Sequence, residues 1–400
     1  MSDAESPKRR AQLVLVTPDG AVVGALPALS VDTPWWQHVE PVVERARQVF
    51  GIEVVVLRLL AADRDRPPGG QVTYLAEIAE PAPATSWRGT LEDHPLRRDY
   101  ARPGGPAADL AWAETALATR GLHLTGKPVQ VRTWNLSSLW RLPVADRAAW
   151  LKCVPPFMRH EGSLLRRLAG ARVPTVLGAE AGRTLMADVP GLDLYDPTAA
   201  QAMAMVDLLV DLQRAWSGRI AVLLGLGVPD WRAPALIAAI ADVVERTRSE
   251  IDAEDGVTLD RFVEDLPRRM AEAEACGLPD TLVHGDFHPG NVRGEGLDLT
   301  LLDWGDAAIG HPLLDQAAFL SRLSPDLVDE TRARWLNLWR QAYPGADPAR
   351  AEALLAPVAA ARAAAVYRRF LDGIEPSEHP YHRADPANWL RRTAALLQPG

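Results

Sequence analysis

The sequence predicts an α+β protein in which a small α/β domain precedes two lobes, the first mostly β and the second mostly helical. Three observations support this fold class. Residues 11–80 mix strand-like and helical patterns, residues 129–187 hold five strand-like runs around one helix, and the chain after Pro190-Gly191 is mostly helical. A chain of 400 residues is also longer than one ordinary domain.

Residues 1–80 are assigned to the N-terminal α/β domain. Asp19-Gly20 is a hairpin-turn signal, while Pro41 and Gly51 mark the start and the end of a helix with an apolar stripe. The strands of this domain are expected over residues 12–17, 21–26, 52–60 and 71–78.

Residues 81–106 are rich in Pro, Gly and charge and are predicted to be a linker. The helix expected over residues 107–120 has an apolar face, which needs a surface to cover it. We therefore expect this helix to dock the N-terminal domain on the following lobe. The alternative is an independent domain on a flexible tether.

The bridging helix and the small lobe occupy residues 107–190, and the helical lobe occupies residues 191–400. Small-lobe strands are expected over residues 129–133, 139–144, 149–154, 175–179 and 183–187, with a helix over residues 158–169. Asp196 is expected to cap a long helix that ends near Trp216. Further helices are expected over residues 233–251, 259–276, 327–342, 348–371 and 386–397.

Composition excludes several classes of protein. A formal net charge of −9 argues against a nucleic-acid-binding protein, which needs a basic face, and is compatible with a cationic substrate. The two cysteines, Cys153 and Cys276, form neither a disulfide framework nor a metal-binding motif. No apolar leader follows the polar N-terminus and no run of about 18 apolar residues occurs. We therefore expect a cytoplasmic protein with no membrane partner.

Two acidic motifs predict phosphoryl transfer. His284-Gly285-Asp286-Phe287-His288-Pro289-Gly290-Asn291 is followed by Asp303-Trp304-Gly305-Asp306, which comes after a short apolar strand. Phosphoryl transfer needs a carboxylate that orients the attacking hydroxyl, and it needs oxygen ligands for Mg²⁺. Asp286 and Asn291 stand five residues apart around a Pro-Gly turn, so one loop can present both side chains to one pocket.

This pair of motifs resembles the catalytic and metal-binding loops of the aminoglycoside phosphotransferase and choline kinase-like family, from about residue 126 onward. The resemblance implies a bilobal protein-kinase-like fold and a small-molecule kinase that uses ATP or GTP with Mg²⁺. It makes Asp286 the catalytic base and makes Asn291 and Asp303 the metal ligands. It also implies that the catalytic loop is supported by His284, His288, Asp306 and Asp315.

The small lobe supports the same function. Lys152 lies inside an apolar strand, where its ammonium group needs an anionic partner such as the nucleotide phosphates and Glu161. The alternative for Lys152 is an exposed position on an edge strand. The resemblance places the edge of the adenine ring against the backbone at Ala187 and Val189, with Met186 behind the ring. The alternative for Met186 is an ordinary core position.

The loop expected over the phosphates, residues 134–139, departs from the family pattern because it has no glycine. Backbone N–H groups with the hydroxyls of Ser137 and Ser138 could bind phosphate there. The alternative is a plain hairpin turn.

The N-terminal domain resembles a degenerate Nudix domain. A Nudix hydrolase carries metal-binding acids where this chain has Arg45, Gln48 and Val49, so the resemblance implies an inactive module. Three functions therefore compete: an active kinase, a non-catalytic nucleotide-binding protein of the same fold, and a diphosphate hydrolase. Asp286 and Lys152, together with both metal ligands, favour the first.

The acceptor is expected to be a small molecule with a hydroxyl group, such as an aminoglycoside, an amino sugar or an amino alcohol. Residues 372–385 are dense in acids, His and Tyr between two helices. They could line a site for a cationic acceptor, or they could form a solvated loop.

Overall fold

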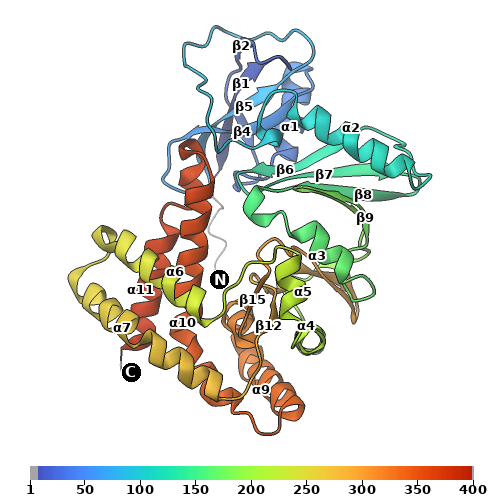
Figure 1. Ribbon diagram of the computed structural model, residues 1–400. Coiled ribbons are helices and arrows are strands. Elements are labelled where there is room, and N and C mark those ends of the chain that lie inside the picture. The colour runs from blue at the N-terminus through green and yellow to red at the C-terminus, as the bar shows by residue number, and fades with distance from the viewer. Residues whose placement is uncertain (1–7, 399–400) are drawn as a thin grey trace. The chain divides into compact units, whose positions relative to one another are not determined.

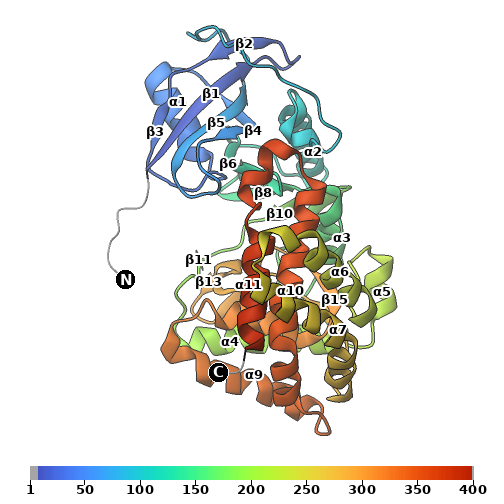
Figure 2. The ribbon, with the colours of Figure 1, turned by 90° about the vertical axis from the view of Figure 1, so that its left-hand side faces the viewer.

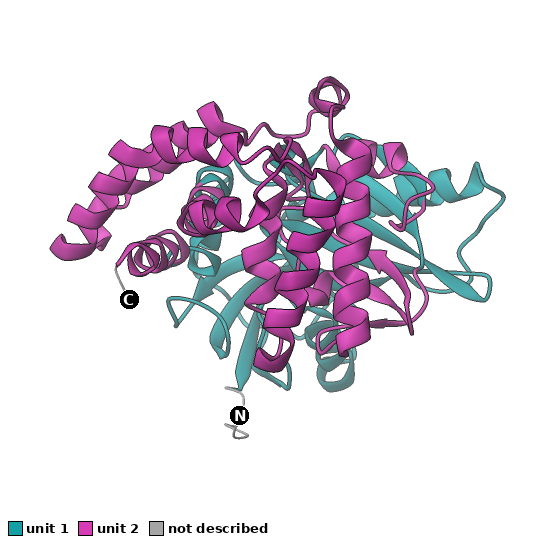
Figure 3. Ribbon diagram, turned by 90° about the horizontal axis from the view of Figure 1, so that it is seen from below, with its two compact units in different colours: residues 1–159, 176–188, 369–384 teal, residues 160–175, 189–368, 385–400 magenta. Residues whose placement is uncertain are grey.

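Residues 8–398 are described by a computed structural model, and the chain packs as two units that each draw on three segments (Figure 3). Unit 1 comprises residues 1–159, 176–188 and 369–384. Unit 2 comprises residues 160–175, 189–368 and 385–400. The N-terminal domain and the small-lobe sheet therefore belong to one unit. The predicted α+β fold class is confirmed.

The N-terminal domain is a five-stranded sheet with one helix (Figure 1). Its elements are β1 Arg9–Val16, β2 Val22–Ala25, β3 Leu29–Val31, α1 Glu40–Phe50, β4 Val55–Ala62 and β5 Gly70–Glu77. The strand order is β2-β1-β5-β4, with β3 also paired to β1; β1 and β5 are parallel. Pro41 lies in the first turn of α1, and Gly51 closes the helix in a left-handed conformation, as predicted.

The small-lobe sheet has the antiparallel order β6-β7-β8-β10-β9. Its strands are β6 Val129–Trp134, β7 Ser137–Val144, β8 Arg147–Cys153, β9 Val176–Glu180 and β10 Arg183–Ala187. Helix α2, Gly105–Ala118, buries Ala113 and Leu117 in the same apolar cluster as Leu142, Leu151 and Leu185 of this sheet. The helix expected to dock the N-terminal domain therefore covers the small-lobe sheet instead.

The N-terminal domain docks along β6, the edge strand of the small-lobe sheet. Thr133 N donates to Gln37 O at 3.1 Å, and Val39 N donates to Val131 O at 3.3 Å. The side-chain amide of Gln130 bonds both backbone groups of Val56 in β4, at 2.7 and 2.9 Å. An otherwise unpaired strand edge is thus satisfied by the neighbouring domain.

The predicted linker is packed rather than free. Thr85 and Ala25 exchange two backbone hydrogen bonds, and Tyr100, in the short 3₁₀ helix Asp99–Ala101, is 4% exposed. The flexible-tether alternative is therefore wrong. Residues 369–384 also pack into unit 1, through the 3₁₀ helix Pro376–Tyr381 against β4 (Figure 2).

Unit 2 is mostly helical. Its helices are α3 Glu161–Arg167, α4 Ala199–Trp216, α5 Ile220–Gly225, α6 Ala233–Arg246, α7 Ala253–Ala275, α8 Gln316–Leu320, α9 Pro325–Ala342, α10 Pro348–Gly373, whose last turns belong to unit 1, and α11 Asp385–Leu397. Its short strands are β11 Leu192–Asp193, β12 Thr281–Val283, β13 Val292–Glu295, β14 Asp298–Leu301 and β15 Ala308–Gly310. None of the helices within residues 8–398 is long and apolar enough to cross a membrane.

The predicted cap of α4 was wrong by two residues. Thr198, not Asp196, is the N-cap: its hydroxyl accepts from Gln201 N at 3.3 Å, and the Gln201 amide accepts from Thr198 N at 3.0 Å. This reciprocal capping box satisfies two N–H groups at the helix start, which a lone Asp196 would not do.

Candidate active site

The predicted catalytic loop connects β12 to β13 in unit 2 and is held at its start by Asp315. The two oxygens of this buried carboxylate accept from His284 N at 2.9 Å and from Gly285 N at 2.8 Å. Gln213 of α4 donates to the same carboxylate at 3.0 Å. Burial raises the pKa of Asp315, and the neighbouring His284 and the two backbone N–H groups oppose that rise.

His284 ties the catalytic loop to the second acidic loop. Its ring is fully buried, and Nε2 lies 2.8 Å from Leu302 O, one residue before Asp303. The ring also packs against Trp304, with centroids 4.5 Å apart. Burial lowers the pKa of His284, so the ring is neutral at pH 7 and acts as a brace.

Asp286 is presented to solvent by its two neighbours on the loop. Its side chain is 50% exposed. Asn291 Nδ2 donates to Asp286 O at 2.9 Å and to Asp286 Oδ2 at 3.1 Å. His288 Nδ1 accepts from Gly290 N at 3.0 Å, and its Nε2 lies 3.6 Å from Asp286 Oδ2. Both side chains approach the same carboxylate oxygen, Oδ2, and the Asp286 side chain stays half-exposed.

Asp303 follows β14 and has an uncommon backbone conformation. Its φ is +58°, in the left-handed region, and its side chain is exposed. Non-glycine residues in this region cluster at functional sites. The next residue, Trp304, donates its N–H to Glu161 Oε1 of α3 at 3.0 Å. Leu302 N donates to Asn291 O at 2.8 Å, which places the two acidic loops side by side.

Gly285 permits a close approach between these loops. Its φ is +88°, and a Cβ here would lie 2.0 Å from the carbonyl oxygen of Asp306. Any larger residue would push the two loops apart. The glycine in the first motif therefore has a structural reason.

The donor set fits a magnesium ion. Because the Asn291 amide donates through Nδ2 to two acceptors, its orientation is fixed, and the other end of the amide is the oxygen Oδ1. Asp303 adds an exposed carboxylate. Oxygen ligands are what Mg²⁺ prefers, and Mg²⁺ takes only one or two protein carboxylates when phosphates supply the remainder. Within residues 8–398, no cluster of three or more His, Cys, Asp or Glu side chains suited to a metal occurs.

Arg362 of α10 is a site residue that the sequence analysis missed. It is 5% exposed, and NH1 donates to Gly285 O at 3.3 Å. Burial lowers its pKa, while Asp315, Asp306 and Asp286 oppose that shift. Arg362 thus places a buried positive charge behind the acids of the site. Its signal was a lone Arg inside the Ala-rich run of residues 359–365.

The predicted nucleotide residues of unit 1 lie on the small-lobe sheet. Lys152 is on β8, between β7 and β10, so the edge-strand alternative is wrong. Met186 and Ala187 are half-buried at the end of β10. Ser137 and Ser138 are buried at the start of β7, and their hydroxyls accept from the ring N–H groups of two Trp residues. In unit 2, Val189 O accepts from Arg293 Nε at 2.7 Å.

The polar residues expected to line an acceptor site are buried elsewhere. Glu375 pairs with Arg97 at 2.7 Å, and Glu378 accepts from Leu59 N at 2.9 Å. Tyr381 and His382 are also buried in unit 1. Both interpretations of this segment, an acceptor site or a solvated loop, are therefore wrong for these four residues.

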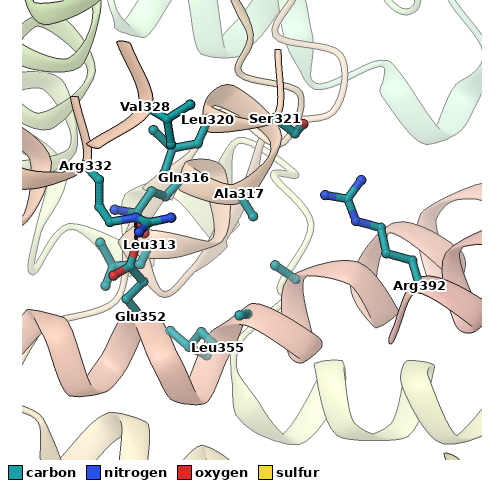
Figure 4. Close-up of a pocket in the computed structure, with 12 residues that line it drawn as sticks. Leu313, Gln316, Ala317, Leu320, Ser321, Val328, Arg332, Glu352, Leu355 and Arg392 are labelled. Atoms are coloured by element: carbon teal, nitrogen blue, oxygen red, sulfur yellow. Dashed lines mark ion pairs between the residues drawn. The ribbon is translucent and has the colours of Figure 1, made fainter. Parts of the chain in front are cut away.

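A cavity of about 280 Å³ lies instead between α8, α9, α10 and α11 (Figure 4). Leu313, Leu320 and Leu355 make much of its wall apolar. Arg332 and Glu352 form an ion pair at 3.2 Å on one side. The wall from α8 is close to the catalytic loop, because Phe319 of α8 stacks on Phe287 with centroids 4.5 Å apart.

One comparison with a solved structure supports the fold. The chain resembles a choline/ethanolamine kinase family protein from Mesorhizobium loti, at 17% identity over 73% of this chain and 95% of that chain, with a TM-score of 0.52. It also resembles a macrolide 2′-phosphotransferase from Brachybacterium faecium, at 18% identity over 73% and 99% of the two chains, with a TM-score of 0.49. At these identities the first likeness establishes the kinase-like fold alone.

Sequence comparison identifies the family. No curated protein matches the chain. The profile described as "Phosphotransferase enzyme family" matches residues 153–354, which is just over half of the 400 residues. This stretch holds both acidic loops and the residues that orient them, apart from Arg362. The chain therefore belongs to the phosphotransferase enzyme family.

Proposed function

We propose that this protein is a small-molecule kinase that transfers the γ-phosphate of ATP or GTP to a hydroxyl group, with Asp286 as the catalytic base. The observation that carries the proposal is the geometry of Asp286. Its carboxylate is half-exposed, oriented by Asn291 and His288, and mounted on a loop that Asp315 holds rigidly. A base must be both accessible and fixed in direction.

Each residue of the site has a separate proposed role. Asp286 accepts a hydrogen bond from the acceptor hydroxyl and takes its proton as the oxygen attacks. Asn291 Oδ1 and the Asp303 carboxylate would hold Mg²⁺, which neutralises charge on the phosphates when bound. Glu161 fixes the backbone beside Asp303 through the Trp304 N–H. His284 connects the two loops through Leu302 O, and Asp306, whose carbonyl oxygen lies close to Gly285, is proposed to support the catalytic loop.

For the nucleotide we propose the residues that the family resemblance assigns. Lys152 binds phosphate, and its partnership with Glu161 stays a prediction. The remaining proposed contacts are Ser137, Ser138, Met186, Ala187 and Val189. The hydroxyl oxygens of Ser137 and Ser138 each accept a hydrogen bond from an indole N–H group. Each hydroxyl can therefore still donate its own hydrogen to a phosphate oxygen.

For the acceptor we propose a hydroxyl-bearing molecule whose apolar part occupies the cavity next to α8. The cavity walls are largely apolar, and its two opposite charges are paired with each other. Amino alcohols belong in the test because the Mesorhizobium loti protein is named a choline/ethanolamine kinase family protein. The free thiols Cys153 and Cys276 agree with a cytoplasmic location.

One experiment separates this proposal from a non-catalytic nucleotide-binding protein. The purified protein is incubated with Mg-ATP or Mg-GTP and a panel of aminoglycosides, macrolides, amino sugars and amino alcohols, and phosphorylated acceptor is measured by mass spectrometry. A kinase gives product with at least one acceptor and loses it in Asp286→Asn. Nucleotide binding without product across the panel favours the non-catalytic alternative.

A further inference from the structure

The turn between β6 and β7 is the predicted phosphate-binding turn, and it is unusually enclosed. Its two residues, Asn135 and Leu136, are 5% and 7% exposed. Such turns in phosphate sites are commonly glycine-rich, so that the backbone can approach the ligand. Here neither residue is glycine, and the turn is shaped by its surroundings instead.

Two distant segments of unit 1 hold Asn135 directly. Tyr100 OH, from the predicted linker, donates to Asn135 O at 3.0 Å. His382 Nε2, from the segment after α10, bonds Asn135 Oδ1 at 3.0 Å. Both the backbone and the side chain of one turn residue are therefore fixed by residues that lie far from it in sequence.

The strand that leads into the turn is held in the same way. The ring of Trp134 contacts Tyr381 in an edge-on arrangement at 5.5 Å and contacts His382 at 5.3 Å. Upstream, Thr133 N and Val131 O bond the N-terminal domain at Gln37 and Val39. Contacts thus continue along β6 and into the turn.

We infer that the N-terminal domain, the linker and residues 376–382 form a built-in support that sets nucleotide affinity by fixing the β6–β7 turn, with Tyr100 and His382 as positioning residues. This inference rests on the proposed nucleotide site. Restricting the turn beforehand reduces the conformational entropy lost on binding.

A matched pair of substitutions tests the inference. Tyr100→Phe removes only the hydroxyl that reaches Asn135. Tyr74→Phe removes another buried hydroxyl, which donates to Trp36 O at 2.6 Å and accepts from Arg9 NH1 at 3.2 Å, with no hydrogen bond to the turn. We expect Tyr100→Phe to raise the Kd for Mg-ATP and the nucleotide KM about three- to tenfold with kcat nearly unchanged. Tyr74→Phe should lower the melting temperature similarly without changing the nucleotide Kd.

Substitutions of His382 provide a second, independent test of the inference. His382→Ala should weaken Mg-ATP binding, and His382→Gln, which keeps a donor for Asn135, should restore part of the affinity. Wild-type Kd values in both Tyr100→Phe and His382→Ala would overturn the inference. Absence of Mg-ATP binding in the wild-type protein would instead overturn the proposed function, so the two failures are distinguishable.

Discussion

Asp286 depends on side chains that orient it without covering it, and this can be tested by a change of one atom. Asp286→Asn keeps the size of the side chain but loses the proton acceptor and the negative charge. We expect kcat to fall by about 10²-fold or more, with the Kd for Mg-ATP unchanged. Steady-state kinetics and calorimetric binding measure the two quantities. Wild-type turnover would remove Asp286 from the mechanism.

Asp303 combines a proposed metal-binding role with a left-handed backbone, and two substitutions separate these properties. Asn tolerates φ near +58° better than Ala does. Asp303→Asn should therefore lose activity and shift the Mg²⁺ titration while it keeps the wild-type melting temperature. Asp303→Ala should lose activity and also have a lower melting temperature, because its free energy of unfolding falls by roughly 1 kcal/mol. An unchanged Mg²⁺ titration in both variants would show that the metal binds elsewhere.

Arg362 should matter for activity although neither motif contains it. Arg362→Met removes the charge behind three acids and the bond to Gly285 O, so we expect a tenfold or larger fall in kcat and a lower melting temperature. Arg362→Lys keeps the charge, so its kcat and melting temperature should lie between those of the wild type and those of Arg362→Met. Arg340→Met on the exposed face of α9 is the matched control. Equal kcat in Arg362→Met and the control would show that the buried charge is dispensable.

The candidate site residues fall into two groups, those that lie in a recognisable sequence motif and those that do not. Asp286, Asn291 and Asp303 were predicted because loop chemistry needs fixed residue types at short spacing. Arg362 was not, because it acts from a helix more than 70 residues away and its local pattern is that of a packed helix. Gln213 was missed for the same reason.

Among the elements, long periodic segments were predicted well and short ones were not. α10, with 26 residues, begins at the predicted residue because its helical spacing extends over several turns. α5 and α8 have six and five residues, too few to show a period. The docking of the N-terminal domain was assigned to α2, since an apolar helical face does not reveal which sheet it covers.

The cavity beside α8 makes an element-level prediction about the acceptor. Ala317 lines this cavity and is exposed. Ala317→Phe adds a ring to a space of about 280 Å³ without disturbing the core. We expect the acceptor KM to rise about tenfold or more, while the nucleotide Kd and the melting temperature stay the same. An acceptor KM equal to that of the wild type would place the acceptor outside this cavity.

At the scale of the whole molecule, the N-terminal domain should be inseparable from the small lobe. A chain that starts near Gly121 lacks α2 and the partner of β6, so it exposes the sheet that Ala113 and Leu117 cover. We expect this truncation to be insoluble or to melt well below the full chain. A soluble truncation with full activity and the full-length melting temperature would contradict the packing described above.

The buried acid Glu378 should make stability depend on pH. Burial raises its pKa to about 8; Glu375 adds to the rise, while Leu59 N–H and Arg58 oppose it. Its protonated form fits the fold, so its stabilising contribution is complete below about pH 4.5 and is lost as pH rises towards 8. The loss is at most ~1.4 kcal/mol per pH unit. Glu378→Gln should flatten the decline of melting temperature between pH 5 and 8, and an unchanged slope would assign the decline to other groups.

The division into units could not be predicted from sequence. Our boundaries were consecutive, whereas each unit takes three separate segments. Glu375 and Glu378 have the composition of a solvated loop, and only their partners, Arg97 and Leu59, about 280 and 320 residues earlier in the chain, reveal their burial. Local patterns carry no information about such contacts.

The return of residues 369–384 into unit 1 has a consequence for biosynthesis. A ribosome makes the N-terminal domain and the small-lobe sheet long before it makes the segment that completes their packing. Until residue 384 has left the exit tunnel, Arg97, Asn135 and the ring of Trp134 lack the partners that later enclose them. The two sheets of unit 1 have all their strands by Ala187, but they lack this part of their covering while about half of the chain is still being made. We expect chaperones to bind the exposed surface during that interval.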